Sequence, residues 1–241
     1  MKDDVESLAE KLSIDLGTSY DQWFTPRGYP GVACAVLDSI YSTGNHYTGV
    51  RRLVSRYVDH RKDEGADPTQ DTATDLVNFI ERSGGAGAFA EMTGYRWRAW
   101  SSKTAPFKAE VALDAARLLK AHEYESIASI RERLADREER ENSDIARGWY
   151  RLPGQRSGLT WNYMLMLSGL PGVKADRMIR RYVTRALDRE RLIGAKTASR
   201  LVEEAADALG LPHTTLDHTI WRFESKREYL KSPDFQPGQK G

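Results

Sequence analysis

The chain has 241 residues, with 36 Lys and Arg against 35 Asp and Glu, so its formal net charge is +1. This balance excludes a basic nucleic-acid tail and an acidic disordered chain, and a 40% share of hydrophobic residues suffices for a packed core. The single cysteine, Cys34, excludes an intrachain disulfide, a cysteine-ligated iron–sulfur cluster and a multi-cysteine zinc site.

The apolar stretches and the N-terminus predict a soluble, cytoplasmic protein. The longest stretches, such as Gly31–Leu37, are far too short to span a bilayer. The start, Met1–Asp4, is acidic and shows no secretory signal. We therefore expect no membrane partner, and we expect the chain to be a monomer.

Hydrophobic periodicity predicts an all-α fold of about ten helices. Apolar stripes at helical spacing are, in chain order, Val50–Val58, Thr72–Arg82 (ended by Ser83–Gly85), Phe107–Leu119 and Leu201–Leu209 before Gly210. Two further segments, Pro30–Ile40 and Tyr163–Leu167, are apolar on almost every face, which favours buried helices. These two helices either share one core or mark two lobes that meet at a cleft.

Two long segments contain no carboxylate. An average of 35 acidic residues in 241 predicts about 4.5 of them in residues 145–175, which hold none. Residues 92–109 also hold none, and there basic side chains alternate with aromatic ones. This pattern is typical of a surface that faces a polyanion, although chance and buried loops can also produce it.

A Gly-rich turn, Leu152–Gly158, lies inside the first acid-free segment, and a helix is expected to follow it. Such a turn presents backbone N–H groups at a helix N-terminus, where they can hold a phosphate without reading a base. Asp176 follows, the only carboxylate between Asp144 and Asp188, at the start of a basic helix. A fixed anion there could stabilise positive charge on a sugar during glycosidic cleavage, or it could simply cap the helix.

With these features, the sequence resembles the helix–hairpin–helix DNA glycosylase superfamily, in which a Gly/Pro-rich loop is followed by Asp. Val36–Val50 looks like the family's early helix and turn, and Phe107–Leu119 is similar to the helix before its hairpin. The resemblance runs from about Gly31 to Tyr182 and implies two helical lobes with DNA in the cleft between them. It predicts one unit over residues 1–241, with a lobe at 31–145, a hairpin and catalytic region at 146–187, and a second lobe from 1–30 and 188–241.

The resemblance implies a catalytic role for Asp176. The DNA contacts it implies are Gly154, Gln155, Arg156, Ser157 and Gly158 on the hairpin, with Lys174 and Arg177 nearby. Bifunctional members place a nucleophilic lysine at the end of the hairpin, where this sequence has Gly158, so the monofunctional type is the closer match. A displaced lyase role for Lys174 remains an alternative. No cofactor, metal or iron–sulfur cluster is expected.

The pocket for the flipped base is less well defined. Asp38 lies in an apolar run and could read a base edge, although a satisfied core carboxylate fits equally well. In the family a Gln after the early helix often fills the gap left by the flipped base, and here Ser42, Asn45 or His46 occupies that region. Near the C-terminus, His213, Asp217 and His218 offer too few clustered ligands for a metal and are expected to cap and begin the last helix.

The sequence thus predicts a monofunctional DNA glycosylase that flips a base out of double-stranded DNA, hydrolyses its N-glycosidic bond and leaves an abasic site. The target base stays open between damaged bases in repair and hypermodified bases in defence against phage DNA. The alternative is a non-catalytic DNA-binding protein with the same fold.

Overall fold

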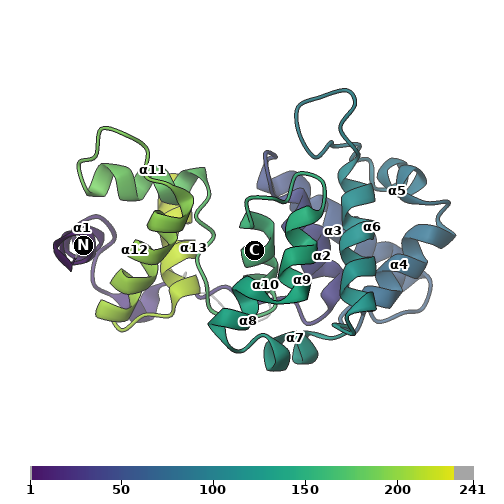
Figure 1. The fold of residues 1–241 in the computed structure, drawn as a ribbon, viewed down its shortest axis with the longest axis horizontal. Coiled ribbons are helices and arrows are strands. Elements are labelled where there is room, and N and C mark those ends of the chain that lie inside the picture. The colour runs from purple at the N-terminus through teal and green to yellow at the C-terminus, as the bar shows by residue number, and fades with distance from the viewer. Residues whose placement is uncertain (1, 231–241) are drawn as a thin grey trace. The chain divides into compact units, whose positions relative to one another are not determined.

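A computed structural model describes residues 2–230, which form thirteen α-helices, one short 3-10 helix and no strand (Figure 1). The all-α prediction is confirmed for these residues. The helices are α1 (Lys2–Leu16), α2 (Val32–Tyr41), α3 (Tyr47–Asp63), α4 (Ala73–Arg82), α5 (Ala86–Thr93), α6 (Lys108–Ala121), α7 (Ile127–Arg133), α8 (Arg137–Asn142), α9 (Asp144–Arg151), α10 (Leu159–Leu167), α11 (Arg177–Ala186), α12 (Ala195–Ala208) and α13 (His213–Glu224), and the 3-10 helix is Tyr20–Gln22. No helix in the described part of the chain is long and apolar enough to cross a membrane.

The prediction of about ten helices was too low because several helices are short. Helices α5, α7 and α8 have eight, seven and six residues. Helices of about two turns or fewer cannot display a recurring apolar stripe, so periodicity alone does not reveal them. Local caps mark two of them instead, since Ser126 and Asp136 accept backbone N–H bonds at the starts of α7 and α8.

The chain divides into two compact units whose boundaries differ from the predicted lobes. Unit 1 comprises residues 1–27 and 171–241, and unit 2 comprises residues 28–170. The predicted hairpin and catalytic region, 146–187, is therefore split, and its part from residue 171 onward belongs to unit 1. The reason is packing: Val173, Ala175 and Ile179 are buried in the same core as helices α12 and α13.

Unit 2 is organised around α2, of which every residue is buried. Helix α10 packs against α2, and both contribute to one hydrophobic core. The prediction of two buried helices is confirmed, and they share a core. The predicted stripes appear as α3, α4 and α6, which pack around α2.

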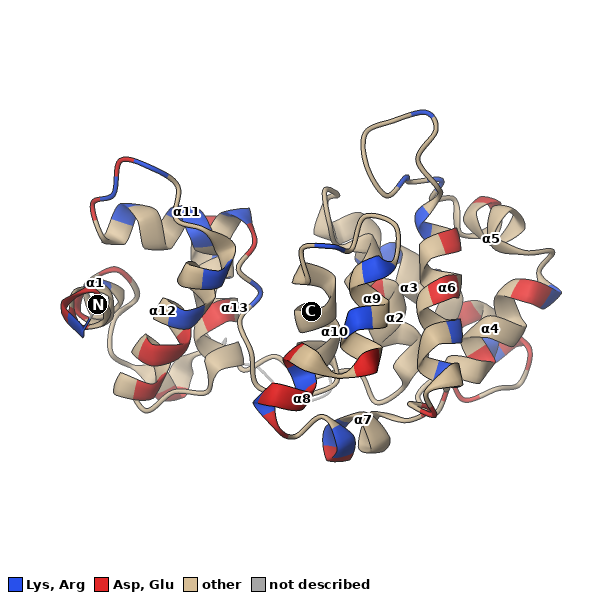
Figure 2. Cartoon of the chain, in the orientation of Figure 1, with Lys and Arg blue, Asp and Glu red and all other residues tan. Residues whose placement is uncertain are grey.

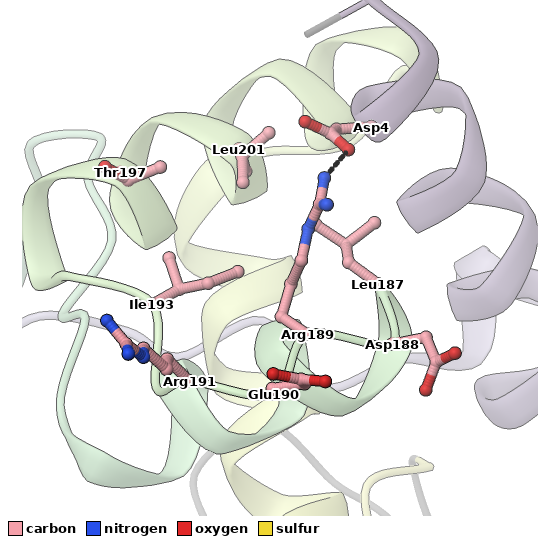
Figure 3. Close-up of a pocket in the computed structure, with 9 residues that line it drawn as sticks. All are labelled: Asp4, Leu187, Asp188, Arg189, Glu190, Arg191, Ile193, Thr197 and Leu201. Atoms are coloured by element: carbon pink, nitrogen blue, oxygen red, sulfur yellow. Dashed lines mark hydrogen bonds and ion pairs between the residues drawn. The ribbon is translucent and has the colours of Figure 1, made fainter.

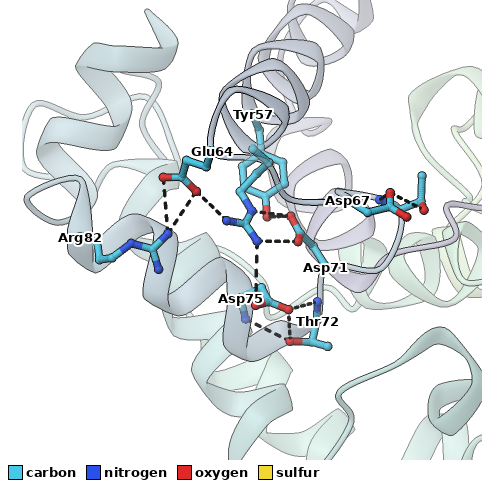
Figure 4. A network of polar contacts seen from close by, with 9 residues as sticks. Tyr57, Glu64, Asp67, Asp71, Thr72, Asp75 and Arg82 are labelled. Atoms are coloured by element: carbon cyan, nitrogen blue, oxygen red, sulfur yellow. Dashed lines mark hydrogen bonds and ion pairs between the residues drawn. The ribbon is translucent and has the colours of Figure 1, made fainter.

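A buried ion pair ties the end of α3 to the segment before α4 (Figure 4). The Arg61 guanidinium donates to both carboxylate oxygens of Asp71, each at 2.8 Å, and Tyr57 Oη donates to the same carboxylate. Arg61 also donates to Glu64 at 2.6 Å. Because every charge is paired, this network can lie in the interior and fix the α3–α4 corner.

Unit 1 is built from both ends of the chain. Leu8, Leu12 and Leu16 on α1 lie in one core with Leu201 and Val202 of α12. Helix α1 packs against α12, and α11 and α12 both contact α13. The predicted stripe of α12 is confirmed, and Gly210 follows it with φ +66°, a left-handed conformation that glycine adopts without strain.

Candidate functional site

Asp176 is the N-cap residue of α11 in unit 1. Its Oδ1 accepts hydrogen bonds from the backbone N–H groups of Met178 at 2.7 Å and Ile179 at 3.3 Å. The predicted cap is therefore present, but it occupies only Oδ1, and no hydrogen bond within the described residues reaches Oδ2. The residue is half-buried.

A second carboxyl group, Asp217 of α13, meets the segment that leads to Asp176. Asp217 is 7% exposed, and its Oδ1 accepts a hydrogen bond from the backbone N–H of Lys174 at 2.9 Å. Burial raises the pKa of Asp217 well above its usual range, and the nearby charge of Asp176 raises that pKa further. The two groups thus form an asymmetric pair, one capping a helix and one buried.

The sequence analysis missed Asp217 as a site residue. The motif around it, His213–His218, offered only a weak metal pattern and the start of a helix, and α13 does begin at His213. Nothing local showed that Asp217 would lie against a segment more than 40 positions earlier. The available signal was a carboxylate flanked by Leu216 and Ile220, both fully buried, because such a position requires a partner.

Helix α12 covers the same segment from another side. Ser199 Oγ donates to the carbonyl oxygen of Val173 at 3.4 Å. Lys196 lies three positions before Ser199, so the two residues share a face of α12. The segment 173–176 is therefore surrounded by α12, α13 and the start of α11, and a second lysine besides Lys174 lies on a helix that borders it.

His218, next to Asp217, is held neutral. Burial, together with repulsion from Arg222 and Arg227, lowers its pKa to about 4. Its ring stacks against Trp221 with centroids 5.9 Å apart and lies 5.4 Å from the ring of Phe24.

The predicted phosphate-binding turn, Leu152–Gly158, joins α9 to α10 in unit 2. Gly154 and Gly158 have φ +77° and +73°, so the turn uses conformations that favour glycine. Gly158 is the N-cap residue of α10 and provides no side-chain cap, but Ser157 Oγ accepts the Leu159 N–H at 3.4 Å and the Gly158 N–H donates to the Gln155 carbonyl oxygen at 3.0 Å. Phosphate binding at the start of α10 therefore stays a prediction. The turn lies in unit 2, whereas Asp176, Lys174 and Arg177 lie in unit 1.

The side chains of this turn divide into two kinds. Gln155 is 3% exposed, and it accepts a hydrogen bond from Thr160 and donates one to the carbonyl oxygen of Pro153. Its side chain braces the turn, and its backbone N–H donates to the Leu152 carbonyl oxygen at 3.0 Å, so the predicted DNA contact of Gln155 stays a prediction. Arg156 and Ser157 are exposed, and Arg177 of unit 1 is exposed as well.

The two acid-free segments lie against each other within unit 2. A Cβ built on Gly154 would lie 3.4 Å from Ala99 Cβ and 3.6 Å from Trp100 Cε3. Figure 2 shows the loop before α6 and the turn after α9 with Lys and Arg but no Asp or Glu. The sequence predicted both segments, and the structure adds that they adjoin.

Asp38 is 1% exposed and lies among tyrosines of unit 2. Its Oδ2 accepts hydrogen bonds from Tyr29 Oη at 2.9 Å and Tyr47 Oη at 3.5 Å, and Tyr47 is hydrogen-bonded to Tyr163. Burial first and Asp38 second raise the pKa of the Tyr29 hydroxyl well above its usual range, which keeps it a donor. These contacts satisfy Oδ2 of a core carboxylate, and a role of Asp38 in reading a base stays a prediction.

The predicted gap-filling residues differ in what they already contact. Asn45 Nδ2 donates to the carbonyl oxygens of Tyr41 and Thr43, each at 3.1 Å, and so caps the end of α2. Ser42 Oγ donates to the Ser39 carbonyl oxygen at 2.9 Å. His46, by contrast, is exposed at the start of α3, which makes it the best placed of the three to reach a ligand.

A pocket of about 480 Å³ lies in unit 1 at the α11–α12 loop (Figure 3). Leu187, Ile193 and Leu201 contribute apolar lining, and Arg189 reaches across to Asp4 at 2.6 Å. Asp188 and Glu190 add negative charge, so this pocket is poorly suited to a polyanion. No group of three or more metal-ligating side chains is found among residues 2–230.

The comparisons with known proteins identify the family of this all-α protein. A family model described as "Domain of unknown function (DUF8548)" matches residues 6–225, so the chain belongs to that family. The match covers nearly all of both units. Searches among curated proteins and among solved structures found no match.

Proposed function

We propose that the protein is a monofunctional DNA glycosylase, which hydrolyses the N-glycosidic bond of a flipped base and leaves an abasic site. The observation that carries the proposal is the carboxyl pair: Asp176 caps α11, and Asp217 accepts the backbone N–H bond of Lys174, two residues before Asp176. The resemblance of the hairpin and the following Asp to DNA glycosylases, together with the acid-free surface of unit 2, supports DNA as the substrate.

The pair is suited to glycosidic cleavage because its members differ in environment. The raised pKa of Asp217 keeps its proton available for the departing base, which leaves with the electron pair of the C1′–N bond. Asp176, with Oδ2 free, stabilises the positive charge that develops on the sugar and accepts a proton from the attacking water. Water then supplies the new bond at C1′, and no lysine adduct forms.

The test is base release from DNA, measured by mass spectrometry on alkylated, oxidised and deaminated duplexes and on phage DNA with hypermodified bases. Asp176→Asn and Asp217→Asn should each slow release by about two to three orders of magnitude, while Asp188→Asn, which removes an exposed carboxylate of the same unit, should not. Release should also fall as the pH rises through the pKa of Asp217, because the acid form is then lost.

The second candidate is a non-catalytic DNA-binding protein, and the cap formed by Asp176 favours it. In that case Asp176→Asn would change little, because Asn is as good a helix cap as Asp. DNA binding without release of any base from the whole panel would support this candidate over the glycosylase.

A further inference from the structure

The loop before α6 is firmly anchored at its base. The Ala99 N–H donates to the Pro106 carbonyl oxygen at 3.0 Å, and the Lys108 N–H donates to the Trp97 carbonyl oxygen at 2.8 Å. The Arg98 guanidinium lies 4.3 Å over the centre of the Phe107 ring. Two backbone hydrogen bonds and one cation–π contact hold the base of the loop. Residues 100–105 therefore form an ordered tip.

This tip presents an exposed tryptophan. The side chain of Trp100 is 48% exposed, whereas Trp23, Trp149 and Trp161 are fully buried. Its ring lies beside Gly154, the first glycine of the α9–α10 turn. A large apolar ring held at the surface by an ordered loop is available to a partner.

The charges around Trp100 indicate an anionic partner. No acidic residue occurs in residues 92–109 or 145–175. Lys103 on the tip and Arg156 on the turn are exposed, and neither forms an ion pair with any residue of the described chain. Other exposed arginines of unit 2 do have partners, such as Arg96 with Glu91 at 2.7 Å. Cations without local carboxylates beside an aromatic ring favour a nucleic acid over an apolar protein surface.

We propose that Trp100 stacks on a base of DNA that has lost its pairing partner, with Lys103 and Arg156 contacting the adjacent phosphates. The inference rests on the proposed function, because removing a nucleotide from the duplex is what leaves such a base. It assigns to the loop tip a role that the sequence analysis had placed on Ser42, Asn45 or His46. Gly154 adopts the left-handed φ of +77° that glycine accepts without strain, and a Cβ there would lie in ordinary van der Waals contact with the Trp100 ring.

The experiment uses the full chain and two fluorescent duplexes, one intact and one with an abasic analogue opposite 2-aminopurine. Wild-type protein should quench the 2-aminopurine of the abasic duplex and bind that duplex more tightly. Trp100→Ala should abolish the quenching and weaken binding to the abasic duplex by about 5- to 150-fold, the range for losing one base–aromatic stack. Trp100→Phe should retain most of both signals.

Two controls separate stacking from charge and from general loss of apolar surface. Lys103→Ala should reduce the slope of log affinity against log salt by about one for both duplexes while leaving the quenching. Ile14→Ala, which alters an exposed apolar residue of α1, should change neither signal.

Normal quenching and binding by Trp100→Ala would overturn the inference, as would a wild-type protein that binds neither duplex. The proposed function is tested separately: it is refuted if Asp176→Asn and Asp217→Asn release bases at the wild-type rate.

Discussion

Acidification should destabilise the protein through His218. The pKa of this histidine is about 4 in the folded chain, against 6.5 for an unperturbed side chain. Between these values the unfolded state binds the extra proton, so this group stabilises the fold above pH 6.5 and loses that contribution as the pH falls. Its loss is about 2 kcal/mol between pH 7.5 and pH 5 and approaches about 3 kcal/mol below pH 4.

The assay is urea unfolding of wild-type protein and of His218→Phe at a series of pH values. Phenylalanine keeps the aromatic contacts with Trp221 and Phe24 but takes up no proton. The difference between the two proteins isolates the histidine, because other groups, including Asp217 with its raised pKa, titrate in both. A free-energy difference that stays constant from pH 7.5 to pH 5 would refute the assignment of a neutral, buried His218.

Three further predictions concern binding, chemistry and the framework. Arg156→Ala and Lys174→Ala should each weaken duplex binding and flatten its salt dependence, and binding that ignores salt would remove the basis for a DNA substrate. Borohydride should trap no covalent adduct with DNA. If an adduct appeared, its loss in Lys174→Ala or in Lys196→Ala would identify the nucleophile. Asp71→Ala should cost about 3–5 kcal/mol of stability in thermal or urea unfolding, because the buried guanidinium of Arg61 loses both hydrogen bonds to its buried carboxylate and keeps only the exposed Glu64. A cost below about 1 kcal/mol would contradict the described network.

The sequence predicted the helices that carry a long apolar stripe, because one face of each helix must be buried wherever it packs. It also predicted that α2 is buried on all sides, and every residue from Val32 to Tyr41 is. No local pattern encodes the packing of α1 against α12, about 190 residues later. The family resemblance nevertheless implied a lobe built from residues 1–30 and 188–241, and unit 1 differs from that lobe mainly by including residues 171–187.

The candidate site was predicted in part for the same reason. Asp176 was recognised as an isolated carboxylate, and its cap was anticipated from its place at a helix start. Asp217 reaches the same segment only through the packing of α13, and the contact of Gly154 with Trp100 depends on how two distant loops fold back. The sequence thus revealed which segments lack acidic residues, whereas the fold determined which side chains and loops come into contact.

The most direct test of the account measures two properties of Asp217→Asn and compares each with wild type: the rate of base release and the free energy of unfolding. The Asn side chain can still accept the Lys174 N–H bond but cannot carry the charge that burial penalises. We predict a variant at least as stable as wild type at neutral pH that binds DNA normally and releases bases about two to three orders of magnitude more slowly. Release at the wild-type rate by both Asp217→Asn and Asp176→Asn, with DNA binding intact, would contradict the proposed carboxyl pair.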